Sequence, residues 1–220
     1  MKNKKLALFT VFVVLGIPFI YATYLYPTLP DTIPTHFNIR GEADGWGGRD
    51  SIFLGPGIIA FAGLFTYFLL ANIKKLDPKK NEQVSAVFYQ NMGVVVSLFL
   101  SCLSLIILYV TAHPGYPIEK ILFPLLGLAF AATGWYFPKF SQNYFAGFKL
   151  PWTLENVNNW NETHKIAGKV WLVCGSIQVL AGMLLSAKPS FIVFFANCIV
   201  MVIVPTVFSY RMFKNGNQLT

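Results

Sequence analysis

The sequence predicts an all-α, polytopic membrane helix bundle with six transmembrane helices. Hydrophobic residues make up 55% and charged residues 12% of the 220 residues, and the mean hydropathy is +0.55. Soluble domains carry about 25% charged residues, so this composition excludes an ordinary soluble class. The third observation is a set of apolar runs, each close to the roughly 20 residues that cross a bilayer.

The apolar runs lie at residues 6–25, 52–73, 91–112, 119–137, 168–187 and 190–210. Each run is expected to be a helix, because lipid offers no partner for an unpaired backbone N–H or C=O group. None shows the alternation that is typical of barrel strands. The first run is interpreted as a transmembrane helix rather than a signal peptide, because it is long and no small-residue cleavage site stands out near its end.

We expect two regions in the chain. Residues 1–90 hold the first two helices, a basic connection and a Pro-rich insert at 26–51. Residues 91–220 hold the other four helices and a long polar and aromatic stretch at 138–169, which we call the PWTL segment. In the fourth run Gly127 and Ala131 form a small-xxx-small pair, a pattern that favours close helix packing.

The basic residues predict the orientation. Of the 17 Lys and Arg residues, 13 fall on one side of the six spans, and the four on the other side are Arg40, Arg49, Lys120 and Lys188. The positive-inside rule then places both termini and the PWTL segment in the cytoplasm and the Pro-rich insert outside. The net charge of +8 reflects this topology, and no nucleic-acid partner is expected.

Polar residues inside the spans are few. No ionisable residue lies in the central part of a run, which argues against an ion-coupled transporter, since such proteins need charged groups at mid-depth. Gln178 and Asn197 should reach the same depth on neighbouring antiparallel helices and form an interhelical polar pair. Cys102, Cys174 and Cys198 fall within runs and indicate no disulfide.

The Pro-rich insert is the first candidate site. Its prolines fix φ and favour extended backbone, and its glycines permit a turn back to the membrane, so we expect a shaped outer cap. The residues expected to bind a ligand or partner there are Pro30, Pro34, His36, Asn38, Gly41 and Asp44.

Three roles stay open for His36 and Asp44. They could hold a metal or perform acid–base chemistry together with His113, they could pin the loop by hydrogen bonding, or they could contact an external partner. A zinc site needs three or four ligands, and the chain has no HExxH motif or paired-ligand spacing. We therefore predict no metal, no cofactor and no catalytic residue.

The PWTL segment is the second candidate site. Thr153 is expected to cap a helix over residues 154–165, on which Trp160 and His164 share one face. Aromatic and basic residues favour either an anchor in the headgroup layer or a docking surface for a cytoplasmic partner. The residues proposed to bind that partner are Asn143, Gly147, Lys149, Pro151, Trp152, Thr153, Trp160 and His164.

Two strings carry a family resemblance. The stretch 26-YPTLPDTIPTHFNIRGEADGWGGRDS-51 resembles the Pro-rich motif of the SdpI family of bacterial membrane proteins. The stretch 143-NYFAGFKLPWTL-154, followed by Trp160 and 163-THKIAGK-169, resembles the second signature of that family. Both signatures occur in the family's order and at the expected places, so the resemblance covers nearly the whole chain.

The resemblance implies a multi-pass protein of the bacterial cytoplasmic (inner) membrane. It implies immunity to a secreted antimicrobial peptide toxin, and signalling in which a small cytoplasmic repressor is held at the membrane. Its partners would then be the lipid bilayer, the toxin and the repressor. Two alternatives remain open from the residues alone: a membrane enzyme with an outer metal or acid–base site, and an accessory membrane subunit.

Overall fold

The computed structural model of the chain describes residues 2–38, 42–76 and 85–216. Within these ranges six helices are long and apolar enough to cross a membrane, which confirms the predicted membrane helix bundle. They are α1 (Lys2–Leu25), α2 (Leu54–Ala71), α4 (Ala86–Ala112), α5 (Glu119–Tyr136), α7 (Val157–Leu184) and α8 (Ala187–Gly216).

Short elements connect these helices. The Pro-rich insert forms two strands, a feature that the all-helical prediction did not contain. The short elements are η1 (Tyr26–Thr28), β1 (Thr32–Phe37), β2 (Ala43–Gly48), η2 (Arg49–Phe53), α3 (Ile73–Leu76), η3 (Phe137–Lys139) and α6 (Pro151–Glu155).

The helices group into two compact units. The first comprises Met1–Ile73 and Ala86–Leu122, and the second comprises Lys74–Ser85 and Phe123–Thr220. Within the first unit α4 packs against both α1 and α2. Each unit therefore has three long helices, with one of the two inserts after its first helix.

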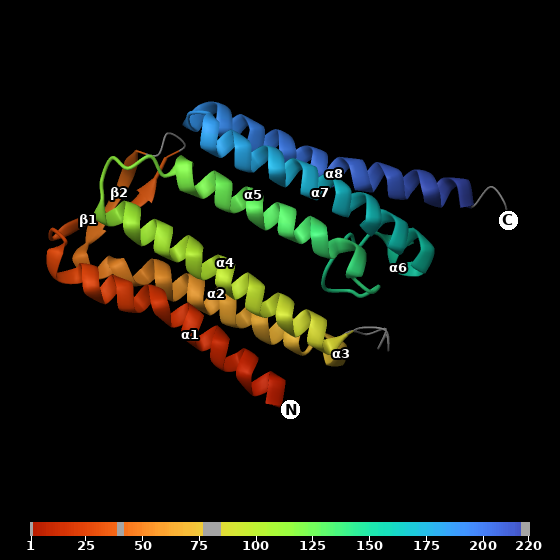
Figure 1. Cartoon of the computed structure of the whole chain (residues 1–220), viewed down its shortest axis with the longest axis horizontal. Coiled ribbons are helices and arrows are strands. Elements are labelled where there is room, and N and C mark those ends of the chain that lie inside the picture. The colour runs from red at the N-terminus through yellow and green to blue at the C-terminus, as the bar shows by residue number, and fades with distance from the viewer. Residues whose placement is uncertain (1, 39–41, 77–84, 217–220) are drawn as a thin grey trace. The chain divides into compact units, whose positions relative to one another are not determined.

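In the first unit, the hairpin of β1 and β2 lies at the end where α1 finishes and α2 begins (Figure 1). Ile33 of β1 is only 1% exposed and joins a cluster with Leu25, Ile52 and Leu108. Removing such a side chain from water stabilises a fold by about 1.5–3 kcal/mol. The hairpin is thus fixed to the helix ends by a buried apolar contact.

In the second unit, glycines bring α5 and α7 together. A Cβ built on Gly134 would lie 2.6 Å from the backbone nitrogen of Leu172, and one built on Gly127 would lie 2.6 Å from that of Val179. Gly175 of α7 meets Ala131 in the same way. The small-residue pair predicted in the fourth span therefore lies in a helix contact of the kind that small residues favour in membranes.

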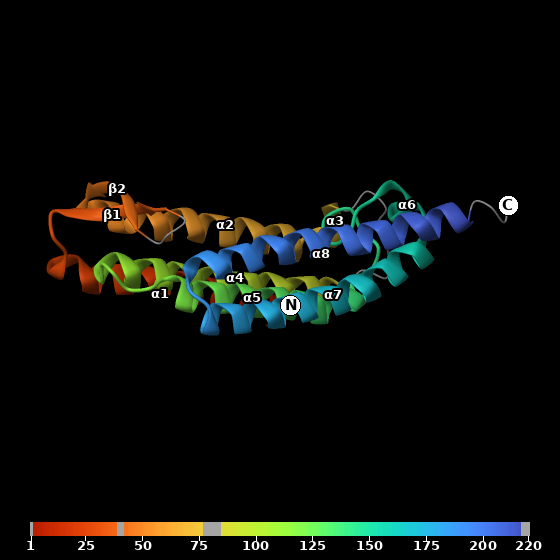
Figure 2. The same ribbon diagram turned by 90° about the horizontal axis from the view of Figure 1, so that it is seen from above.

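Helices α7 and α8 run side by side in both views (Figure 2). The predicted pair of amides joins them, because Asn197 Nδ2 donates to Gln178 Oε1 at 3.2 Å. The same nitrogen lies 3.1 Å from the carbonyl oxygen of Cys174. Both amide side chains are buried, so these hydrogen bonds satisfy groups that lipid cannot.

The start of α7 differs from the sequence prediction. The helix begins at Val157, where the Asn156 side chain accepts a hydrogen bond from Asn159 N at 2.9 Å, and it continues without a break through the fifth span. Thr153 caps no helix there and lies inside α6. Asparagine is as good an N-cap as threonine, and the carbonyl of Asn156 is free to start α7 because α6 has already ended.

Candidate functional site

The hairpin at the end of the first unit has an irregular antiparallel register. Thr32 pairs with Gly48 and Pro34 with Trp46, and the pairing slips on both sides of His36. Such irregularities redirect side chains out of the regular alternation. Proline is tolerated because neither strand of a two-stranded sheet is central, so its missing N–H need not lie in a ladder.

Glycines in β2 permit this close pairing. A Cβ on Gly45 would lie 2.9 Å from the His36 Cβ, and one on Gly47 would lie 2.6 Å from Ser51 Oγ and 2.9 Å from the Thr35 methyl group. The Gly-rich tail of the insert is therefore required by the strands themselves. It gives β1 room to lie against β2.

Hydrogen bonds between two pairs of residues hold the base of the hairpin. Arg49 donates to an Asp31 carboxylate oxygen at 2.6 Å, and its backbone N–H donates to the Asp31 carbonyl at 2.9 Å. The Tyr26 hydroxyl donates to Asp50 at 2.6 Å. The sequence analysis used Asp31, Arg49 and Asp50 only as charges. Opposite charges at the two ends of one insert could have indicated that these ends pair.

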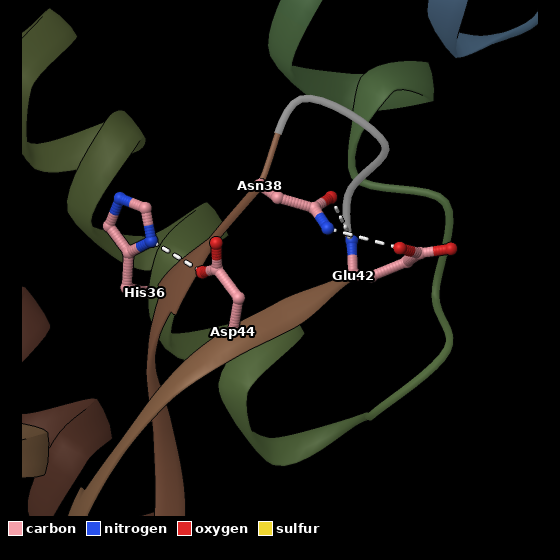
Figure 3. A network of polar contacts seen from close by, with 4 residues as sticks. All are labelled: His36, Asn38, Glu42 and Asp44. Carbon is pink, nitrogen blue, oxygen red and sulfur yellow. Dashed lines mark hydrogen bonds and ion pairs between the residues drawn. The ribbon is translucent and has the colours of Figure 1, made fainter.

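His36 and Asp44 point toward one another across the hairpin (Figure 3). The distance from His36 Nδ1 to Asp44 Oδ1 is 2.5 Å, and the two side chains are 72% and 44% exposed. Further along, Asn38 Nδ2 donates to Glu42 Oε2 at 3.0 Å, and the Glu42 N–H donates to Asn38 Oδ1 at 3.1 Å. Gly41 lies outside the described residues.

An apolar cavity of about 510 Å³ lies against the hairpin within the first unit. Its walls come from the stretch Ile33–His36 of β1, from the start of α2, and from the ends of α4 and α5 that face the hairpin, including Leu108 and Leu122. Pro34 is buried, whereas Pro30 is exposed. The hairpin thus combines an exposed polar edge with a hydrophobic recess, a combination typical of ligand sites.

The hairpin offers little for metal chemistry. Across the described ranges, no group of three or more His, Cys, Asp or Glu side chains is arranged to hold a metal ion. His113, the third predicted candidate, stacks on Tyr109 at a centroid distance of 4.3 Å and lies 2.8 Å from the carbonyl oxygen of that residue. A zinc site needs three or four protein ligands, and His36 with Asp44 would provide two.

In the second unit the PWTL segment folds around buried polar side chains. Asn143 is fully buried, and its amide accepts from Phe145 N and Ala146 N at 2.8 Å and donates to Ser141 O and Ala146 O. Thr153 is also fully buried. Its hydroxyl donates to Phe148 O at 2.7 Å and accepts from Leu150 N at 2.9 Å.

His164 lies at the centre of the same segment. Its ring stacks on Trp160 at 4.1 Å between centroids. Nδ1 lies 2.7 Å from Trp160 O, and Nε2 accepts the Phe148 N–H at 3.0 Å. This pattern requires a neutral imidazole with its proton on Nδ1. Gly147 is pressed against the ring and has a φ of +112°, a conformation that favours glycine.

A third set of contacts joins the segment to the end of α8, which lies beside α6 (Figure 2). The indole N–H of Trp152 donates to Ser209 Oγ at 2.7 Å, and Ser209 Oγ donates to Asn159 Oδ1 at 2.6 Å. Trp152 also stacks on Phe213 at 5.6 Å. Sequence reasoning missed Asn159 and Ser209, because the partners lie 50 residues apart.

The predicted partner-binding residues of this segment therefore fall into three groups by their exposure. Asn143, Thr153, Trp160 and His164 are buried and engaged with the fold itself. Gly147 and Trp152 are half-buried, and Lys149 and Pro151 are exposed. The exposed pair and the uncovered part of Trp152 are the members of the set that lie at the surface.

Comparisons with known proteins match two separate segments of the chain, and each segment contains all or most of one of the two inserts. Residues 139–209 match the model of the SdpI/YfhL protein family, and residues 13–60 match a domain of unknown function, DUF1648. The first match contains most of the PWTL segment with α7 and most of α8, and the second contains the hairpin. Each insert thus lies in a segment that recurs in other proteins.

Two curated relatives are similar in sequence. Immunity protein SdpI of Bacillus subtilis (strain 168) is 22% identical over 93% of this chain and 95% of its own length. An uncharacterized protein of Archaeoglobus fulgidus is 32% identical over 38% of this chain and 46% of its own length. No solved structure matches the chain. The chain is thus similar to the SdpI/YfhL family over residues 139–209, and to an SdpI protein along nearly the whole of both chains.

Proposed function

We propose that this chain is an immunity protein of a bacterial cytoplasmic membrane, which protects its cell against a secreted antimicrobial peptide. The observation that carries the proposal is the similarity to immunity protein SdpI, which extends over 93% of the chain and includes both inserts. The charge distribution supports the orientation that this role requires, with the hairpin outside and both termini in the cytoplasm.

The hairpin is the proposed recognition site for the peptide. Its edge presents the carboxylates of Glu42 and Asp44, which attract a cationic peptide, and Trp46 is 60% exposed beside them. The cavity of about 510 Å³ behind the edge offers room for an apolar side chain. Because contacts at its base already hold the hairpin, binding would cost little loop-ordering entropy.

A second part of the proposal concerns the PWTL segment. We infer that its exposed surface, around Lys149, Pro151 and Trp152, is where a cytoplasmic repressor would be held. A tryptophan side chain such as the half-exposed indole of Trp152 is among the side chains that most often anchor protein interfaces. The buried residues of the segment would then act by shaping this surface.

Survival of a sensitive strain tests the recognition site. A Bacillus subtilis strain that lacks SdpI would express this chain and be challenged with a secreted membrane-depolarising peptide. We expect protection by the wild-type chain and its loss in the double variant His36→Ala and Asp44→Ala. An exposed ion pair contributes only about 0.2–1 kcal/mol, so this change should leave folding intact.

The variant His113→Ala is the matched control, because His113 is another exposed histidine on the same predicted side. It should protect as well as wild type. Equal protection by the double variant would remove the hairpin from the recognition site. Killing of cells that display normal amounts of the wild-type chain would contradict immunity against that peptide.

A further inference from the structure

A groove of about 410 Å³ lies between α5 and α7 in the second unit. It is mainly apolar, with walls from Gly134, Gly168, Ile166 and Leu172. The backbones of the two helices approach closely at the two glycines, as a Cβ on Gly168 would lie 2.8 Å from Gly134 O. The two helix backbones, in contact at these glycines, form the floor of the groove.

Three lysines stand around one end of this groove. Lys139 and Lys169 are exposed, and Lys165 pairs with Glu162 at 2.6 Å. Lys139 lies over the rings of Trp135 and Tyr136, at 5.8 and 5.0 Å from their centroids. With one carboxylate against three ammonium groups, the end of the groove carries excess positive charge.

The position of the lysines along the helices fixes their depth in a membrane. The apolar span that contains α5 ends at Lys139, and Trp135, 64% exposed one turn earlier, is a residue type that prefers the membrane interface. The lysines therefore lie at the headgroup level, while Leu172 lies further into the hydrocarbon. The groove thus has a positive end at the depth of the lipid headgroups and an apolar part at the depth of the acyl chains.

We propose that this groove binds one phospholipid with an anionic headgroup, whose phosphate contacts Lys139 and Lys169 and whose acyl chain lies along Gly134, Gly168 and Leu172. Basic pockets between membrane helices are suited to such headgroups. This inference does not depend on the immunity function. By the predicted orientation, the lipid belongs to the cytoplasmic leaflet.

Native mass spectrometry of the full chain in detergent micelles tests the proposal, with phosphatidylglycerol as the anionic probe and phosphatidylcholine as the zwitterionic one. We expect one tightly bound phosphatidylglycerol. Each lysine near an anionic surface contributes roughly fivefold in affinity, so Lys139→Gln with Lys169→Gln should weaken binding about 25-fold. The control pair Lys74→Gln and Lys75→Gln, two exposed lysines on the same predicted side, should leave it unchanged.

A second readout locates the lipid independently of the lysine variants. Phosphatidylglycerol with brominated acyl chains should quench part of the tryptophan fluorescence, and Trp135→Phe should remove that part. Equal affinity for both lipids, equal losses in the two lysine pairs, or quenching that Trp135→Phe leaves unchanged would overturn the proposal. Displacement of the lipid by inorganic phosphate alone would reassign the lysines to a simple anion site.

Discussion

Replacing Gly147 by alanine is expected to destabilise the second unit strongly. The residue has a φ of +112°, and an alanine held in so sparsely populated a backbone region costs about 1–3 kcal/mol. Its Cβ would also collide with His164 Nε2 and lie 3.2 Å from Trp160 Cη2. If the ring moves, the Phe148 N–H loses its acceptor, at about 1–3 kcal/mol more. The expected total is about 2–6 kcal/mol.

A double-mutant cycle separates the two contributions. In a His164→Ala background the ring is absent, so Gly147→Ala should cost only the backbone strain. The cycle should therefore show a favourable coupling of about 1–3 kcal/mol between the two changes. Denaturation of the full chain in detergent micelles, followed by tryptophan fluorescence, measures the four stabilities.

Gly115→Ala provides the matched control. Gly115 also has a positive φ, of +91°, but a Cβ there would meet nothing within 4 Å. Its cost should match that of Gly147→Ala in the His164→Ala background. Additivity of Gly147→Ala and His164→Ala within about 0.5 kcal/mol would refute the reasoning, because it would show that the ring and the glycine do not constrain each other.

Two further changes test the buried amides. Asn143→Ala leaves two loop N–H groups without their acceptor and should lower the free energy of unfolding by about 2–6 kcal/mol. The control Asn161→Ala, at an exposed position on α7, should lower it by less than about 0.5 kcal/mol. Equal melting temperatures of the two variants would contradict this account. For the interhelical pair, a cycle of Gln178→Leu and Asn197→Leu should give a coupling near 0.6 kcal/mol and no more than about 1.7 kcal/mol. A coupling well above that limit, measured by unfolding in micelles, would mean that the pair does more than join α7 to α8.

The six helices were predictable because one strong constraint sets them. A long apolar run has to satisfy its backbone within itself when it crosses lipid, so length and hydropathy are enough to find it. The pairing of Gln178 with Asn197 followed from the same constraint, since depth is set by counting residues from a tight turn. Helix ends were less predictable, as the start of α7 at Val157 shows, because several capping residues compete within a few positions.

The hairpin was not predictable by pattern. Its strands include Pro34, Gly45 and Gly47, which are depleted in strands, and Ile33 brings its apolar side chain to the core. The contacts that hold it, such as Arg49 with Asp31, join the two ends of the insert. Local sequence signals do not report such pairings.

The two inserts differ in what a loss-of-function variant can reveal. The contacts of His36 with Asp44 are exposed and contribute about 0.2–1 kcal/mol, so a variant that fails to protect cells there reports on recognition. Trp160 and His164 are buried within their own unit, where large-to-small changes cost about 3–5 kcal/mol of stability. A variant at either position that fails to signal therefore does not distinguish a lost partner contact from a damaged fold. A partner surface on the PWTL segment is therefore best tested at Lys149 and Pro151, which are exposed and can be changed while the buried network stays intact.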